Sequence, residues 1–228
     1  PGGQGLGAGR TFSAGGGGGG YGGYGAASAG ATPASGGSTY GSVTAPLDRG
    51  SGGGGRIPDS PSLGGAGGGA IHMMVTGVLL VNGRISANGG AGIAQGGGGG
   101  SGGSVWLMAG TLAGSGIVSA NGGAGNEPGG GGGGGRVVLQ FGMDAFEGAL
   151  SACGGSGYGW GGAGTIYTKA NTQTMGRVLV DNCGHAGTNT PLPYLSPFDL
   201  TLSGGAVAYP STPYLLLSNL FVTSGGTL

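Results

Sequence analysis

Residues 85–105 read ISANGGAGIAQGGGGGSGGSV, and between the two ends only Asn88, Ile93 and Gln95 carry a side chain larger than that of serine. Such a stretch cannot fill an ordinary hydrophobic core, and it contains no obvious acid, base or metal ligand. Its glycines must therefore be explained by backbone packing or by disorder. The way this stretch recurs along the chain decides between the two.

The motif SANGGAG at residues 86–92 recurs at nearly constant spacing. It returns as SANGGAG at 119–125 after 33 residues, as SACGGSG at 151–157 after 32 more, and as a degenerate DNCGHAG at 181–187 after a further 30. Two short runs with β-strand character precede each copy, for example SVWLMA and GIVSA, and the last such pair is TIYTK and GRVLV. A glycine-rich return such as GNEPGGGGGGG follows each of the first three copies. One unit therefore consists of a strand, a turn, a second strand and a polyglycine return.

A unit of this kind cannot bury its apolar face alone, so we expect the units to stack at the spacing of β-strands. The predicted fold is all-β, a parallel β-solenoid-like array of repeats of about 30–33 residues. The glycine returns are expected to bundle in the polyglycine II conformation, because chains without Cβ atoms approach closely enough to exchange backbone hydrogen bonds. Disorder is the alternative, since glycine has the most backbone entropy to lose on folding, but the periodicity argues against it.

Composition divides the chain into three parts. Residues 1–66 are glycine-rich with a weaker pattern, and their GGYGGYG motif, with Tyr21 and Tyr24, fits a linker, a tyrosine cross-linking site or a packed return. Residues 67–189 hold the repeats. Residues 190–228 open with the proline-rich TPLPYLSPFD, and then LTLSGGAV aligns with FVTSGGTL 21 residues later, which predicts the start of a narrower β-helix. Because the chain begins and ends inside such patterns, we interpret it as a segment of a longer protein.

The two cysteines test the proposed register. Cys153 and Cys183 take the repeat position that Asn88 and Asn121 hold in the earlier copies. Stacking places equivalent positions one strand spacing apart, close to the Cα separation that a disulfide prefers. We therefore predict a Cys153–Cys183 disulfide, stacking of Asn88 on Asn121 as an amide pair, and an oxidising, extracellular compartment. Two buried free thiols, or a metal site short of ligands, are the alternatives.

Charge and motif content indicate no chemistry. The formal net charge is zero and only 6% of residues are charged, against roughly 25% in an average domain, so neither nucleic acid nor an anionic membrane is an expected partner. No apolar run approaches the length of a membrane span. With 69 glycines, Gly-x-Gly-x-x-Gly matches are expected by chance. His72 and His185 do not recur in register, and the close acid pair Asp144 and Glu147 falls in a predicted loop. We predict no enzyme activity, no cofactor and no metal.

Ser/Thr-Pro steps are candidate sites for O-linked glycans, on the hydroxyl groups or on hydroxylated prolines. They are Thr32-Pro33, Ser60-Pro61, Thr190-Pro191, Ser196-Pro197 and Thr212-Pro213. The chain contains no N-x-[ST] acceptor for N-linked glycans. Any glycan on this segment is therefore expected to be O-linked.

The units GRISANGGAGIAQGGGGGSGGSVWLMAG and GIVSANGGAGNEPGGGGGGGRVVLQF resemble the glycine-rich repeats of large secreted and surface proteins of protists, algae and some bacteria, including the shell proteins of flagellar hairs (mastigonemes). The resemblance covers residues 67–187. It implies an extracellular, often glycosylated, filament or coat component. A more distant likeness is to the glycine-rich domain of the anaplastic lymphoma kinase ectodomain, which shares glycine but no motif with this chain.

Two classes of function follow from these features. The first is a structural subunit of an extracellular filament or surface appendage, which associates with itself or with other filament proteins. The second is a binding module, an adhesin stalk or receptor-type domain, which presents loops such as residues 174–197. Ice binding would need a flat, regular face of Thr or Ala, and a parallel β-helix enzyme would need clustered acids. The sequence supplies neither.

Overall fold

The computed structural model describes residue 9 and residues 15–56, 62–195 and 197–228. These residues form strands and no helix, so the fold is all-β as predicted. The strands are β1 (Ala70–Leu80), β2 (Arg84–Ser86), β3 (Ser104–Gly114), β4 (Ile117–Ser119), β5 (Arg136–Phe146), β6 (Ala149–Ser151), β7 (Thr165–Ala170), β8 (Arg177–Asp181), β9 (Asn189–Leu192), β10 (Phe198–Ser203), β11 (Val207–Pro210) and β12 (Leu217–Val222).

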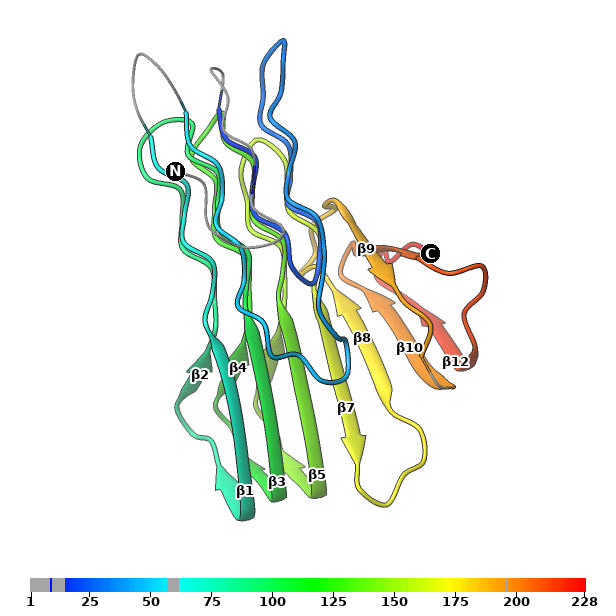
Figure 1. The fold of residues 1–228 in the computed structure, drawn as a ribbon. Coiled ribbons are helices and arrows are strands. Elements are labelled where there is room, and N and C mark those ends of the chain that lie inside the picture. The colour runs from blue at the N-terminus through cyan, green and yellow to red at the C-terminus, as the bar shows by residue number, and fades with distance from the viewer. Residues whose placement is uncertain (1–8, 10–14, 57–61, 196) are drawn as a thin grey trace.

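Three open sheets contain these strands. The largest has the order β1-β3-β5-β7-β8-β10-β12, the second has β2-β4-β6, and β9 pairs with β11. Every pair is parallel except β7 with β8, which is antiparallel. In Figure 1 the strands of the first units occupy the lower part of the molecule, and glycine-rich segments run upward from them side by side. The sheets are therefore mostly parallel, as the sequence predicts.

Strands β1, β3 and β5 lie in matching register. Ser104 at the start of β3 faces Ala70 on one side and Arg136 on the other. Alternate residues of β3, among them Val105 and Leu107, point inward and are buried. They pack against β4 and the start of the following turn, where Val118 and Ala120 are also buried, so this core lies between the large sheet and the β2-β4-β6 sheet.

The fourth unit departs from the predicted pattern. GRVLV was expected to continue the second row of strands, but β8 turns back, pairs with β7 in antiparallel fashion and joins the large sheet. The reason lies in the loop between them. β1, β3 and β5 each have eleven residues, whereas β7 has six and ends at a turn in which Gln173 donates to the carbonyl of Ala170. The longer connection through 171–176 allows the chain to reverse within one sheet.

A second run of parallel strands follows this reversal. β8, β10 and β12 stack in parallel, and their core includes Val178, Leu200 and Leu202. Each strand ends in a turn whose two central residues have positive φ; these pairs are Cys183-Gly184 (56° and 87°), Gly204-Gly205 (57° and 74°) and Ser224-Gly225 (48° and 76°). Such values are typical of a type I′ turn.

The spacing between β10 and β12 is one residue shorter than the sequence motifs predict. Aligning the two SGG motifs gives 21 residues, but Leu200 faces Leu220, and the Asp199–Asn219 pair beside them is 20 residues apart. Ser224 therefore occupies the place of Gly204, not that of Ser203. The turn geometry sets the register here, and a serine with positive φ substitutes for a glycine.

Candidate functional site

The glycine segments are bonded to one another in three directions. In the stretch 98–103 successive N–H groups donate, over 2.7–2.9 Å, to the carbonyl oxygens of Gly54, Gly130, Gly90, Ser51, Gly133 and Ala87. These acceptors lie on three neighbouring segments, which are visited twice in the same order. The stretch 130–135 repeats the pattern with acceptors Gly16, Gly159, Gly123, Gly19, Gly162 and Ala120. The direction of donation thus recurs every third residue, as it does in a chain with three residues per turn.

This bonding requires close approach of the backbones. A Cβ atom placed on Gly99 would collide with the carbonyl oxygen of Gly123 on the neighbouring segment. Gly69, at the edge of the bundle, has open space where its Cβ would lie. Glycine is thus needed inside the bundle because it lacks bulk, which is the packing role that the sequence analysis predicted.

Residues 15–26, from the segment that fits either a linker or a packed return, lie within this bundle. Gly16 donates to the carbonyl of Gly96, and Gly19 donates to that of Gly99. Tyr21, from the GGYGGYG motif, is fully buried. This part of the N-terminal segment is thus packed among the repeats rather than extended as a linker.

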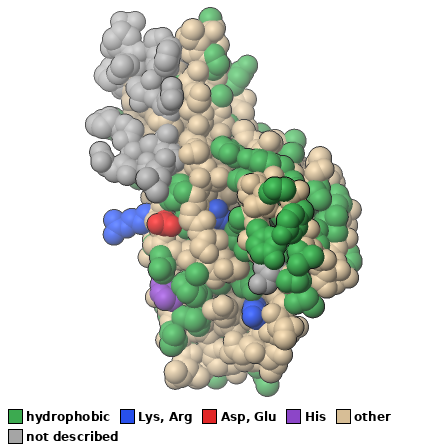
Figure 2. Space-filling model, turned by 45° about the vertical axis from the view of Figure 1, so that its right-hand side comes forward, with side chains coloured by type: hydrophobic (Ala, Val, Ile, Leu, Met, Phe, Trp, Pro, Cys, Tyr) green, Lys and Arg blue, Asp and Glu red, His purple; other side chains and the backbone are tan. Residues whose placement is uncertain are grey.

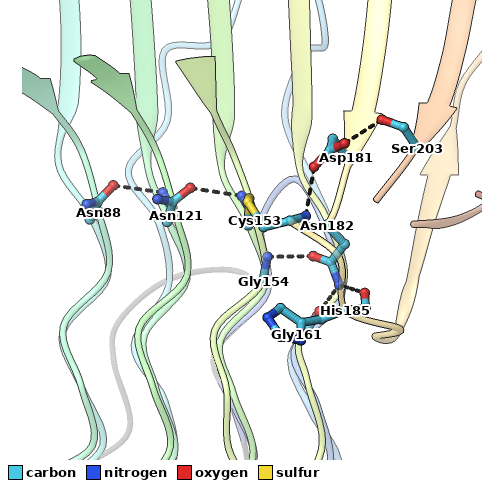
Figure 3. Close-up of a disulfide and its surroundings, with 10 residues drawn as sticks. Asn88, Asn121, Cys153, Gly154, Gly161, Asp181, Asn182, His185 and Ser203 are labelled. Carbon is cyan, nitrogen blue, oxygen red and sulfur yellow. Dashed lines mark hydrogen bonds between the residues drawn. A yellow bond between two sulfur atoms is a disulfide. The ribbon is translucent and has the colours of Figure 1, made fainter. Parts of the chain in front are cut away.

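An asparagine ladder runs across the repeats (Figure 3). The Asn88 side-chain oxygen accepts from the N–H of Asn121 over 2.8 Å, and the Asn121 side-chain oxygen accepts from the N–H of Cys153 over 2.9 Å. The partners are 33 and 32 residues apart, the two spacings of the sequence motif. The predicted stacking of Asn88 and Asn121 therefore takes the form of side chain to backbone bonding, not of an amide pair.

The ladder ends in the predicted disulfide. Cys153 and Cys183 are bonded, with their Cα atoms 5.9 Å apart, and join the last wide unit to the first narrow coil. Asn182, beside them, is buried; its side-chain oxygen accepts from Gly154 N–H and its amide donates to the carbonyls of Gly161 and His185 (Figure 3). The side-chain amide of Asn182 thus makes three hydrogen bonds at the junction.

The sulfur atoms and Asp181 are the one group of potential metal ligands that gathers in the described part of the chain. Both sulfurs belong to the disulfide. The Asp181 carboxylate accepts from the Ser203 hydroxyl and, over 2.7 Å, from the Cys183 N–H. These contacts make the group a turn-stabilising network rather than a metal centre.

A polar row anchors the N-terminal segment to the large sheet. Ser104, Arg136 and Thr165 are the first residues of β3, β5 and β7 and lie in register. The buried Arg136 donates through Nε and Nη2 to the Tyr40 carbonyl, over 3.1 and 2.8 Å, and through Nη1 to Thr165 Oγ1. Its guanidinium also lies 5.4 Å from the ring centre of Tyr21. The sequence does not indicate that Arg136 and the Tyr40 carbonyl are partners, because the two residues are 96 positions apart.

Burial changes the acidity of this row. Desolvation raises the pKa of Tyr21 to about 12, despite the opposing effects of its hydrogen bond to Ser104 and of the Arg136 charge. Desolvation also lowers the pKa of Arg136 from its usual value, and the nearby Tyr21 and Asp48 oppose that change. The Tyr21 hydroxyl lies 2.6 Å from Ser104 Oγ. The row is therefore a buried structural anchor, and its environment favours the protonated form of the Tyr21 phenol.

Both ends of the large sheet are open. On β12, Leu220 and Val222 are 44% and 48% exposed, whereas Leu200 and Leu202, which face them on β10, are fully buried. On β1, Met73 is 37% exposed, whereas its β3 neighbour Leu107 is 1% exposed. Residues on these outer strands thus occupy core positions that nothing covers among the described residues.

A groove of about 630 Å³ lies on the outer face of the large sheet. Its lining includes Trp106, Gln140 and Lys169 from β3, β5 and β7, and Tyr194 and Leu195 from the proline-rich exit. The indole N–H of Trp106 donates to the Gln140 side-chain oxygen over 3.1 Å. Figure 2 shows that hydrophobic side chains gather on one side of this view and that charged ones are few.

His72, His185 and Asp144 each contact a different partner. His72 stacks on Trp106 with ring centres 4.2 Å apart, and His185 stacks on Trp160 at 3.6 Å. Asp144 lies near the end of β5 and not in a loop as predicted; it is exposed, and its side chain accepts from the N–H of Phe146. None of these side chains converges on the groove with a second titratable group.

The candidate glycan sites differ in exposure. Thr32, Pro33, Pro197 and Pro213 are exposed and Thr212 is partly so. Thr190 and Pro191 are buried, and the Thr190 hydroxyl donates to the Ala163 carbonyl over 2.6 Å, so this pair is withdrawn as a glycan site. Ser60, Pro61 and Ser196 lie outside the described residues.

No family model, curated protein or solved structure matches the chain. Within the part of the chain that the structure describes, no helix has the length and apolar character needed to cross a membrane. The contacts described above are therefore the basis for any functional assignment.

Proposed function

We propose that the chain is a structural subunit of an extracellular filament or surface appendage. In this proposal the wide units are turns of a β-solenoid, the glycine segments are polyglycine II chains, and the whole forms a stiff rod that associates with itself or with other filament proteins. Its role is mechanical, and we assign it no catalytic step.

One observation above all supports the proposal: the N–H groups of the glycine segments donate to three neighbours in a three-residue cycle. Threefold chains packed without Cβ atoms bond laterally in this way. Backbone hydrogen bonds join the segments throughout the cross-section of such a bundle, and this property suits a load-bearing rod. The disulfide supports an oxidising, extracellular compartment, because such bonds are rare in the reducing cytosol.

The exposed Ser/Thr-Pro sites support a glycosylated surface. Thr32-Pro33 and Thr212-Pro213 lie in loops, where a glycan would not disturb the strands. We propose O-linked glycans at these sites. A glycosylated exterior fits the glycine-rich filament proteins that the repeat resembles.

A binding module is the second candidate function. The groove beside Trp106 is lined in part by Thr174, Tyr194 and Leu195, which belong to the irregular loop region 174–197. A surface hollow built by irregular loops on a sheet is a common setting for a ligand. An adhesin of this kind would remain solitary, whereas a filament subunit self-associates.

Electron microscopy of native extracellular material, labelled with an antibody to the repeat, distinguishes the two functions. We expect periodic label along filaments. Label on isolated particles or at single tips would overturn the filament assignment in favour of the binding module. An antibody to an unrelated secreted protein of the same material serves as the control for background label.

A further inference from the structure

The outer edge of β1 lacks the features that usually protect an edge strand. Its sequence, AIHMMVTGVLL, contains no Lys, Arg, Asp, Glu or Pro. Charged or proline residues on an edge strand normally prevent pairing with another chain. A bulge between Val75 and Val78 interrupts the strand, so residues 70–75 form the regular part of this edge. This six-residue edge is open, carries no Lys, Arg, Asp or Glu and, apart from His72, is apolar.

The side chains of this edge suit a partner strand on both faces. Ile71 packs toward the core, and Met73 and Val75 lie in register with the core residues Leu107 and Ala109. Met74 points to the opposite face, where it lines a shallow hollow with Met108. An added strand would therefore extend an existing core on one face and cover methionines on the other.

The side chains of this edge determine which partner fits. Ile71, Met73 and Val75 lie on the core-facing side of residues 70–75, and all three are apolar. The row is apolar in both directions from Met73, so it is complementary to itself in an antiparallel pair. The partner that supplies this row is a second copy of this chain.

We propose that β1 pairs in antiparallel fashion with β1 of a second copy, about a two-fold axis perpendicular to the sheet and beside Met73. Antiparallel pairing centred on one residue keeps inward side chains inward, because side chains alternate with a period of two. Met73 then faces Met73 of the partner subunit, and Ile71 faces Val75 of the partner subunit. This inference rests on the filament function proposed above and names the contact at one end of the subunit.

Charge complementation at residue 73 tests the two-fold directly. Leu220→Lys is introduced first to block the β12 end, and we expect this variant to be a dimer by light scattering. Adding Met73→Lys, or separately Met73→Glu, places like charges opposite each other and is expected to weaken the dimer at least ~10-fold. Mixing the two double variants pairs Lys with Glu and is expected to restore a dimer with one chain of each kind.

Met175→Lys in the same Leu220→Lys background is the matched control, since Met175 is exposed to a similar degree but lies in the β7–β8 loop. It should remain dimeric. Monomers from Leu220→Lys alone, dimers from either Met73 variant alone, or monomers from the mixture would each overturn the β1 two-fold. If the unsubstituted chain nevertheless forms filaments, the proposed function survives that result. A monomeric unsubstituted chain overturns both.

Discussion

At the scale of single residues, glycine is required for two separate reasons. Gly99 has ordinary backbone angles and is needed because a Cβ would strike the carbonyl of Gly123. Gly184 has open space around its Cβ position but a φ of 87°, which non-glycine residues rarely adopt. The sequence shows both as the same letter, and only the structure separates close packing from backbone conformation.

Gly99→Ala is expected to lower the free energy of unfolding by about 2–3 kcal/mol, because the added methyl group must push two hydrogen-bonded backbones apart. Gly69→Ala, the same change in open space, is expected to alter it by less than about 0.5 kcal/mol. Urea unfolding of both variants beside the parent measures the difference. Equal stability of the two variants would contradict the packing role of Gly99.

At the scale of elements, the junction between wide units and narrow coils depends on two residues next to each other. Cys183 holds the same repeat position as Cys153 and is joined to it by the disulfide. The side-chain oxygen of Asn182 accepts a hydrogen bond from the N–H of Gly154. The disulfide was predictable because the two cysteines share a repeat position. The reversal of β8 was not, because the sequence of GRVLV matches that of the earlier second strands and only the longer 171–176 connection differs.

Replacing both cysteines by serine is expected to lower the free energy of unfolding by about 3–4 kcal/mol, because the unfolded chain loses the constraint on a loop of 30 residues. Thermal unfolding followed by circular dichroism measures the change. The parent protein in reducing buffer is the control and should unfold at the same lower temperature as the double variant. No change in either sample would show that the bond does not stabilise the junction.

At the scale of the whole molecule, the sequence predicted the all-β class, the mostly parallel sheets and the disulfide, because each depends on periodicity. It did not predict the anchor in which Arg136 and Ser104 hold Tyr40 and Tyr21. These contacts join positions far apart in the chain and carry no repeating signal. Nor did the sequence show that Thr190 is buried, since a Thr-Pro step is typical of an exposed loop.

The anchor predicts how the stability of the whole fold depends on pH. The pKa of Tyr21 is about 12 in the folded protein, above the ordinary tyrosine value of 10.0. At Tyr21 the folded protein therefore binds more protons between these values, so the contribution of Tyr21 to stability is constant below about pH 10 and is lost as the pH rises toward 12. The expected loss from Tyr21 is about 2 kcal/mol near pH 11.5.

Urea unfolding at about pH 9 and pH 11.5 measures this loss in the parent and in Tyr21→Phe. The variant starts about 1 kcal/mol less stable, because it lacks the hydrogen bond to Ser104. Its further loss at high pH should be smaller than that of the parent by the Tyr21 contribution. An equal further loss in both proteins would show that Tyr21 does not titrate with a raised pKa.

The three-way bonding of the glycine segments bears on how such a material would fracture. A β-sheet is hydrogen-bonded along one lateral direction only, and two stacked sheets separate between their faces, where side-chain packing alone holds them. In the bundle the stretches 98–103 and 130–135 are each bonded to neighbours on three sides. In the proposed rod, a crack that runs lengthwise through the bundle therefore breaks backbone hydrogen bonds in whichever lateral direction it opens.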